Sequence, residues 1–186
     1  MKRLHNKVAV ITGACSGIGL ATTELFLAEG AQVVAADVQD EVGQQLQKQY
    51  AGQLHFAHCD VTRLEELRSA IDSAAEHFGG LDILFSNAGR IGTMAGVQAF
   101  SAQAWDETQN LLLRSVAAGA SFAVPHMVKR GAGAIVNTSS ISALQAGYAP
   151  LAYSVAKAGV LHYTRVAAAE LSALNIRINT SGDLKI

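Results

Sequence analysis

A tyrosine and a lysine four residues apart offer the clearest chemistry in this sequence. Tyr153 and Lys157 share one face of any helix that contains both. The lysine ammonium can therefore sit beside the phenol and favour its ionised form. Ser140 precedes this pair by thirteen residues, at the end of an apolar segment. Three such groups can hold one substrate oxygen and exchange a proton with it, although a chance pair on a surface helix has the same spacing.

A glycine-rich loop near the amino terminus supplies a second kind of chemistry. It reads Thr12-Gly-Ala-Cys-Ser-Gly-Ile-Gly19 and lies between an apolar strand and an apolar-periodic helix. Glycines let the backbone turn tightly and approach a pyrophosphate, which meets the free N–H groups at the helix start. The order strand, glycine loop, helix predicts a dinucleotide site. The residues assigned to this site are Gly13, Cys15, Ser16, Gly17, Ile18 and Gly19, with core packing an equally good interpretation for Ile18.

Apolar runs alternate with helical patterns along the chain. The pattern predicts strands at 7–11, 32–36, 54–58, 81–85, 133–138 and 175–179, and helices near 18–29, 40–49, 63–78, 101–128 and 150–173. Nearly continuous apolar strands that alternate with helices are typical of a parallel sheet covered on both faces. We therefore predict an α/β fold with a Rossmann-type doubly wound parallel sheet, in a single domain over residues 1–186.

Taken together, these motifs resemble the short-chain dehydrogenase/reductase family from residue 4 to about residue 180. The family pattern also includes Asn87-Ala88-Gly89 after the fourth strand. The resemblance implies hydride transfer between a nicotinamide and a carbinol or carbonyl carbon. Tyr153 would be the general acid/base, Ser140 would hold the substrate oxygen, and Lys157 would bind the nicotinamide ribose. Residues 87–89 would line the nicotinamide side.

The end of the second predicted strand bears on the choice of cofactor. Asp37 lies about twenty residues past the glycine loop, where a carboxylate accepts hydrogen bonds from the adenosine ribose and repels a 2′-phosphate. This favours NAD, although a solvated aspartate at a strand end is the alternative. By family resemblance, Asp60 would face the adenine amino group and Val61 the adenine ring.

Composition narrows the classes of partner. Half of the 186 residues are hydrophobic and the net charge is −1, so a sizeable core is expected. The lack of a basic run argues against nucleic acid or an anionic membrane as partner. No long apolar segment of the kind found in signal peptides follows the first basic residues, Lys2, Arg3 and Lys7. We therefore expect a cytoplasmic protein. Cys15 and Cys59 are expected to be reduced.

The histidines suggest a metal site that their spacing disfavours. His55 and His58 lie near Cys59 and Asp60, and all four residue types bind metals. On a strand, however, residues three apart point to opposite faces. We therefore predict no metal site.

Two features depart from the family pattern. The family places an asparagine in a run such as W-D-x-x-x-x-x-N-L, where it supports a water-linked proton path to the lysine. The run here begins at Trp105 and places Leu112 at that position. Asn110 comes two residues early, about 200° around an α-helix, and cannot replace the missing amide without a bulge. We expect reduced turnover.

The second departure is at the carboxyl end. The family's Pro-Gly turn and substrate loop are absent after Thr180, and Ser181–Ile186 look like the family's last strand. A segment is apparently missing between Thr180 and Ser181, either deleted or left unrecorded. The remaining pocket wall is residues 143–150, which include Tyr148 and the candidate substrate contact Gln145.

Three functional classes remain open. The favoured one is an NAD-dependent alcohol dehydrogenase or ketoreductase, expected as a homodimer or homotetramer by resemblance. The second is a catalytically weakened NAD-binding or assembly protein, and the third is a sugar-nucleotide epimerase or dehydratase with the same Tyr/Lys pair. NADH formation over a panel of alcohols separates the first two.

Overall fold

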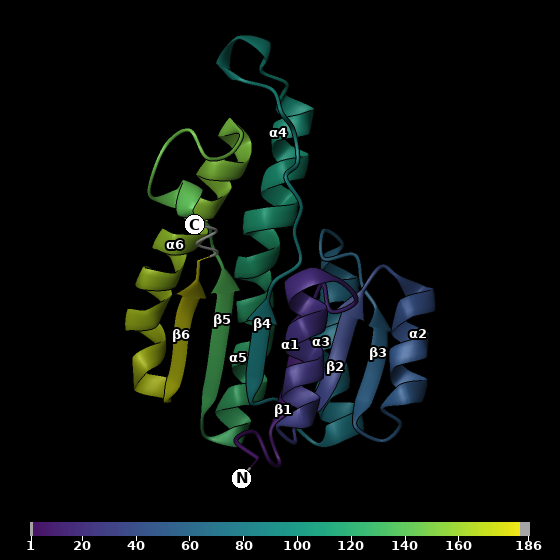
Figure 1. Cartoon of the computed structure of the whole chain (residues 1–186). Helices are drawn as coiled ribbons and strands as arrows, with labels where there is room; N and C mark the ends of the chain where they lie inside the picture. The colour runs from purple at the N-terminus through teal and green to yellow at the C-terminus, as the bar shows by residue number, and fades with distance from the viewer. Residues whose placement is uncertain (1, 183–186) are drawn as a thin grey trace.

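Parallel strands form the centre of the structure, a computed structural model in which residues 2–182 are described (Figure 1). The strands within this range are β1 Val8–Thr12, β2 Gln32–Asp37, β3 Leu54–His58, β4 Ile83–Ser86, β5 Gly133–Thr138 and β6 Ile176–Ser181. They form one sheet in the order β3-β2-β1-β4-β5-β6, with every neighbouring pair parallel. The chain winds from β1 first to one side and then to the other. The predicted doubly wound sheet is confirmed.

Helices connect the strands and cover the sheet. The helices are α1 Gly17–Ala28, α2 Asp40–Gln49, α3 Leu64–Phe78, α4 Ala102–Gln109, α5 Ser115–Arg130 and α6 Leu151–Leu171. One core cluster joins α3 and α5 to the sheet through residues such as Ile71, Met127 and Val10. A second cluster lies on the opposite face, where Leu27 of α1 packs with Val33 of β2. Burial on both faces explains why β1 is an unbroken apolar run.

The two faces of the sheet are not covered equally. Helices α1 and α2 lie over the β1 to β3 half, and Figure 1 shows β5 and β6 with no helix in front of them. In β5, Ile135 and Asn137 are fully buried, whereas Ala134 and Val136 are only partly buried. Because side chains alternate between faces along a strand, this difference shows which face of β5 is the open one.

The helix predicted at 101–128 is interrupted. Helices α4 and α5 are separated by a π-helical turn, Asn110–Arg114, which ends with the Ser115 N–H bonded to the Asn110 carbonyl. Such a turn holds one residue more than an α-helical turn, and π-bulges are frequent at functional sites. The expectation of one continuous α-helix is therefore wrong, and the angle between Asn110 and Leu112 differs from the 200° that it assumed.

The stretch from Ala102 to Arg130 is long and apolar enough, by length and composition, to cross a membrane. Its α5 portion lies against the sheet, where Val116, Ala120 and Met127 are buried. A helix that is apolar around most of its surface is found either in a membrane or in a protein core. The position of α5 against the sheet accounts for the apolar residues on its buried side.

The carboxyl end of the described chain continues the sixth strand. Ser181 pairs with Thr138 of β5, so it belongs to β6 and does not begin a separate last strand. Residues 183–186, the remainder of the expected last strand, lie outside the described residues.

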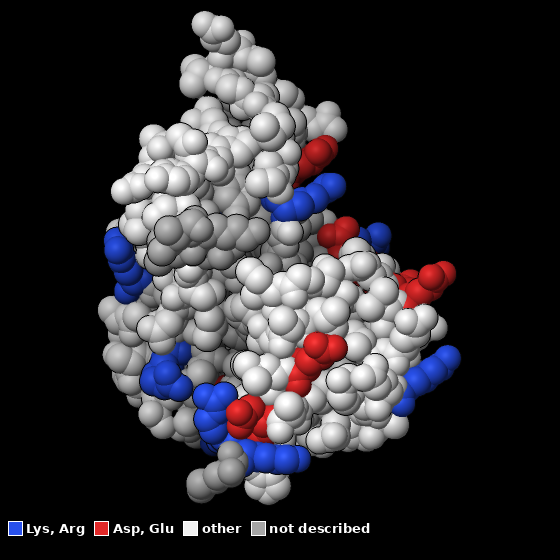
Figure 2. All heavy atoms as spheres, viewed as in Figure 1, with Lys and Arg blue, Asp and Glu red and all other residues white. Residues whose placement is uncertain are grey.

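Charged side chains are interspersed over the face shown in Figure 2. No broad patch of one sign covers this face, which agrees with the net charge of −1.

Candidate cofactor and active site

Glycines shape the loop between β1 and α1. Gly13 has φ +67°, and a Cβ atom there would lie 2.9 Å from the Cα atom of Ala88. A Cβ atom at Gly19 would overlap the carbonyl oxygen of Gly13. Gly17 also has a positive φ, +51°. The loop conformation therefore requires glycine at positions 13 and 19, as the dinucleotide fingerprint predicts.

Asn87 ties this loop to the rest of the sheet. The backbone N–H groups of Asn87 and Ala88 donate to Thr12 Oγ1 at 3.0 and 3.1 Å. The Asn87 side-chain amide donates to the Thr12 carbonyl at 3.2 Å and accepts from the Thr138 hydroxyl at 3.4 Å. Its side chain therefore holds the ends of β1 and β5 together beside β4. Thr12 was not among the predicted site residues, because its partner Asn87 lies 75 residues away along the chain.

Asp37 is held rigidly at the end of β2. Its Oδ2 atom accepts the Cys15 backbone N–H at 2.8 Å, and its Oδ1 atom accepts the Gln39 N–H at 3.1 Å. The Gln39 side-chain amide adds a third bond at 3.3 Å. Asp37 is 6% exposed. The Cys15 side chain, in contrast, is buried in the core, and burial raises the pKa of its thiol to about 12.

A cavity of about 570 Å³ lies along the carboxyl ends of the strands. It is lined by Gly13, Ser16, Asp37, Val38, Gln39, Cys59, Asp60, Val61, Thr62, Ala88, Gly89, Arg90, Glu107, Asn110, Leu111 and Arg114. Seven predicted cofactor residues are in this lining: Gly13, Ser16, Asp37, Asp60, Val61, Ala88 and Gly89. Ligands of doubly wound sheets bind at this edge, where the strand order reverses.

Other predicted residues do not line the cavity but shape its surroundings. Cys15 in the glycine loop and Gly19 in the first turn of α1 are buried. Ile18 is half-exposed, which is incompatible with the core role considered for it. Arg114 was not anticipated, and it donates to the Thr62 carbonyl at 2.7 Å across the cavity rim. Its position depends on the π turn, which the sequence did not indicate.

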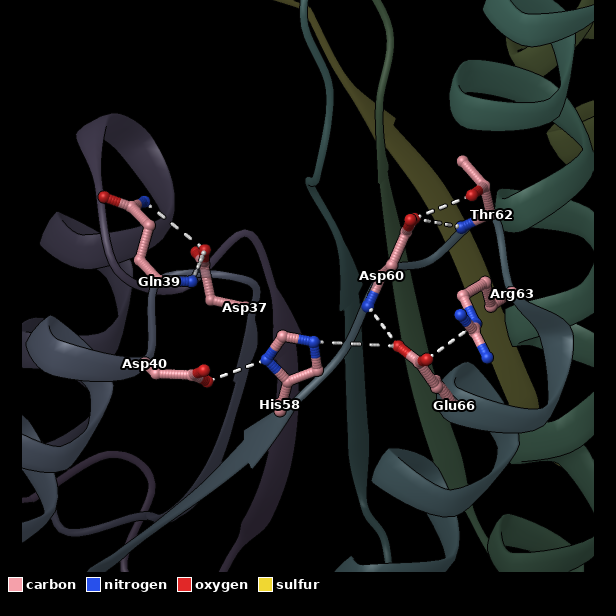
Figure 3. Close-up of polar contacts among 8 residues, drawn as sticks. All are labelled: Asp37, Gln39, Asp40, His58, Asp60, Thr62, Arg63 and Glu66. Atoms are coloured by element: carbon pink, nitrogen blue, oxygen red, sulfur yellow. Dashed lines mark hydrogen bonds and ion pairs between the residues drawn. The ribbon is translucent and has the colours of Figure 1, made fainter.

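Asp60 uses one carboxylate oxygen to order its own loop. Asp60 Oδ1 accepts the backbone N–H and the hydroxyl of Thr62 at 2.9 and 2.7 Å (Figure 3). The pKa of this carboxyl is lowered: burial acts to raise it, and the two Thr62 hydrogen bonds together with the charges of Arg63 and His58 outweigh that effect. Among the described residues, Asp60 Oδ2 has no hydrogen-bond partner. Asp60 therefore presents an acceptor oxygen at a cavity that it also lines.

Ser140, Tyr153 and Lys157 lie where β5 ends and α6 begins. The Lys157 ammonium donates to the Thr138 carbonyl at 2.7 Å and lies 5.6 Å from the centre of the Tyr153 ring. Ser140 begins a 3₁₀ turn, and its hydroxyl accepts the Ser142 N–H at 3.3 Å. Lys157 is 4% exposed, and burial lowers the pKa of its ammonium to about 8.

These three residues do not border the 570 Å³ cavity. These residues and the residues that line the cavity nevertheless lie at the same edge of the sheet, because β1, β2 and β5 are parallel and end there. Ala88 and Gly89 belong to the cavity, and the preceding residue, Asn87, is bonded to Thr138 next to Lys157. A long ligand that starts in the cavity would thus pass residues 87–89 to reach Tyr153.

Leu112 fills the position that the family gives to an asparagine. It is 1% exposed, and a Cβ atom at Gly89 would lie 2.9 Å from Leu112 Cδ2. Asn110 lines the cavity instead. Among the described residues, the Lys157 ammonium donates only to the Thr138 carbonyl, so no side-chain amide is hydrogen-bonded to it directly.

The remaining candidates have simple positions. Gln145 and Tyr148 are exposed on the segment between β5 and α6. His55 stacks on His77 with ring centres 3.7 Å apart, while the His58 ring pairs with Asp40. Within residues 2–182, no group of three or more potential ligands could hold a metal ion.

The parallel sheet, the glycine loop and the Ser140, Tyr153 and Lys157 site are typical of a dinucleotide-dependent dehydrogenase. Sequence comparison identifies the family. The family model described as short chain dehydrogenase matches residues 7–181. The chain therefore belongs to the short-chain dehydrogenase/reductase family.

Individual relatives support this membership. Tropinone reductase-like 2 of Erythroxylum coca is 39% identical over 181 residues, which cover 96% of this chain and 66% of that protein. The (+)-borneol dehydrogenase 2 of Salvia officinalis is 38% identical over 180 residues, 95% of this chain and 64% of the relative. The chain thus spans about two thirds of the length of these relatives. A short chain dehydrogenase from Mycobacterium smegmatis superimposes with a TM-score of 0.91 at 32% identity, covering 98% of this chain and 78% of that structure.

Proposed function

We propose that this protein is an oxidoreductase that interconverts an alcohol and a ketone or aldehyde with NAD(H) as cofactor. The observation that carries the proposal is the position of Lys157. Its buried ammonium is held at the end of β5, one helical turn from Tyr153, at the edge of the sheet that also holds the cavity. Burying an ammonium costs folding free energy. Titratable groups in such surroundings are found preferentially at functional sites.

The lining of the cavity supports binding of the adenosine half of a nicotinamide adenine dinucleotide. Gly13 and Gly19 keep the loop free of side chains where a pyrophosphate would approach the start of α1. Asp37 and Asp60 supply acceptors for an adenosine, and Val61 supplies an apolar wall. When bound, the nicotinamide accepts or donates the hydride. The chain itself binds and orients the cofactor and the substrate, and its side chains transfer the proton.

Asp37 supports NAD over NADP. Its carboxylate is fixed by the Cys15 and Gln39 N–H groups, so it cannot turn away from a ligand. Such a carboxylate accepts hydrogen bonds from ribose hydroxyls and repels a 2′-phosphate. The neighbouring positions 15 and 38 carry no positive charge that would offset the repulsion.

In the oxidative direction, Tyr153 removes the proton of the alcohol while Ser140 hydrogen-bonds to the same oxygen. Lys157 holds its ammonium beside the Tyr153 ring and binds the nicotinamide ribose. General acid–base help of this kind contributes about a hundred- to ten-thousand-fold in rate. The names of the relatives, a tropinone reductase-like protein and a borneol dehydrogenase, support an alcohol or ketone substrate. We further propose a homodimer or homotetramer.

A second candidate function is an NAD-binding protein with weakened catalysis. The observation that favours it is Leu112, whose apolar side chain stands where the family has an amide. Measuring NADH formation over a panel of cyclic and open-chain alcohols, together with NAD binding by calorimetry, separates the two. Binding with turnover supports the oxidoreductase, and binding without turnover on any alcohol supports the second function. The absence of NAD binding would contradict both.

A further inference from the structure

His58 joins two loops that border the same part of the cavity. His58 is the last residue of β3, and its Nδ1 atom lies 2.7 Å from Oδ1 of Asp40, the first residue of α2. Its Nε2 atom lies 4.0 Å from Oε2 of Glu66, in the first turn of α3. Figure 3 shows the ring between these two carboxylates. One side chain therefore faces acids from two different helices.

Both carboxylates are continuous with the cavity wall. Glu66 Oε2 also accepts the backbone N–H of Asp60 at 2.9 Å, and Glu66 Oε1 pairs with Arg63 at 2.7 Å. Asp60 lines the cavity. The position of Glu66 thus fixes the start of the loop that carries Asp60.

The other loop begins with Asp37. Gln39 bonds to the Asp37 carboxylate through its backbone and its side chain, and Asp40 follows directly. Both Asp37 and Gln39 line the cavity. His58 therefore connects the segment 37–40 to the segment 60–66, the two walls where an adenosine would bind.

The protonation state of His58 changes what it can hold. A neutral imidazole donates from one nitrogen only, whereas the imidazolium donates from both. The charged groups that face the ring are Asp40 from α2, Glu66 from α3 and Asp60 from the intervening loop, with Arg63 already paired to Glu66. The hydrogen bond to Asp40 is the largest cause that raises the pKa of His58 above its ordinary value. Only the imidazolium carries a charge that attracts both carboxylates, through the hydrogen bond to Asp40 and the ion pair at 4.0 Å with Glu66.

We propose that His58 is a positioning residue for the adenosine half of the cofactor, and that its protonated ring clasps the segments 37–40 and 60–66 together around that half. The proposal rests on the proposed function in one respect, the binding of a nicotinamide adenine dinucleotide. By linkage, the cofactor then binds more tightly when His58 is protonated and loses affinity as the pH rises through the pKa of His58.

The size of the effect follows from the exposure of the groups. The His58 and Asp40 side chains are 52% and 54% exposed. Ion pairs at such sites are partly screened by solvent, so the affinity should change by about two- to fivefold. Calorimetry resolves a change of this size.

The experiment measures the dissociation constant of ADP-ribose by calorimetry, from about pH 6 to about pH 8.5, for the unmodified protein and for His58→Gln. ADP-ribose carries the adenosine half, and its diphosphate has no ionisation near neutral pH. Asp40→Asn keeps a hydrogen-bond acceptor for the ring and removes the charge. His55→Gln is the matched control, because His55 lies on the same strand but stacks on His77, away from the cavity.

We expect the unmodified protein and His55→Gln to bind about two- to fivefold more weakly at the upper end of this range, and the profiles of His58→Gln and Asp40→Asn to be flat or nearly so. Profiles for His58→Gln and Asp40→Asn that run parallel to that of the unmodified protein would overturn the clasp while leaving the cofactor site intact. If His58→Gln does not fold, Asp40→Asn alone decides in the same way. If no protein binds ADP-ribose at any pH, the proposed function fails and the clasp with it.

Discussion

The Lys157 ammonium lies 2.7 Å from the carbonyl oxygen of Thr138, so helix α6 is tied to the end of β5 by a charged group that is almost completely buried. Burial lowers the pKa of this ammonium to about 8 from an ordinary value of 10.5. Below about pH 8 the folded protein bears the cost of a buried charge, and as the pH rises towards the unfolded value that cost disappears.

The first prediction concerns the pH dependence of stability that Lys157 causes. In this window the unfolded chain binds more protons than the folded chain, so the Lys157 contribution to the free energy of unfolding rises with pH. Relative to Lys157→Met, the unmodified protein should gain on the order of 3 kcal/mol between about pH 7 and about pH 10. Urea unfolding of both proteins at both pH values measures it, because the other titrating groups cancel in the difference. Equal changes in the two proteins would show that Lys157 is not desolvated.

A second prediction concerns the choice of cofactor. Asp37→Asn keeps an acceptor for the buried Cys15 N–H and removes the charge. The preference for NAD over NADP should narrow by about 1 to 3 kcal/mol, the contribution of a charged hydrogen bond. The ratio of the two dissociation constants, determined by calorimetry, is the measurement. Equal affinity of the unmodified protein for NAD and NADP would rule out the role of Asp37.

The third prediction concerns Leu112. If an amide at this position relays protons to Lys157, Leu112→Asn should raise turnover, while the buried amide should lower the stability by about 1 to 3 kcal/mol. Leu112→Ala is the control, because it removes the leucine without supplying an amide. Steady-state kinetics of the unmodified protein and the two variants, on an alcohol that the unmodified protein oxidises, provides the test. Turnover by Leu112→Asn that is unchanged or lower than that of the unmodified protein would reject the relay.

Much of the fold could be predicted because its signals are local. The apolar run ending at Ile11 is continuous because β1 is buried on both faces, and Gly13 and Gly19 have the backbone and space requirements that the fingerprint implies. The position of Asp37 could also be predicted, because it ends the second strand and lies next to the glycine loop.

What could not be predicted depends on contacts between distant segments. The π turn at residues 110–114 includes an i to i+5 hydrogen bond from Ser115 to Asn110, and its sequence Asn-Leu-Leu-Leu-Arg is equally suited to an α-helix. Arg114 is the last residue of that turn and lines the cavity. His58 was considered as a metal ligand and set aside, yet its contacts with Asp40 and Glu66 appear only when α2 and α3 are placed beside β3.

The central claim is that Tyr153 transfers the proton during hydride transfer, and Tyr153→Phe tests it most directly. The measurement is NADH formation on an alcohol that the unmodified protein oxidises, alongside NAD affinity, with Tyr50→Phe at the end of α2, outside the cavity lining, as control. We predict that Tyr153→Phe loses at least about a hundredfold in turnover while its NAD affinity stays within a few-fold, and that Tyr50→Phe remains active. A Tyr153→Phe protein that keeps more than about a tenth of the activity would contradict the account.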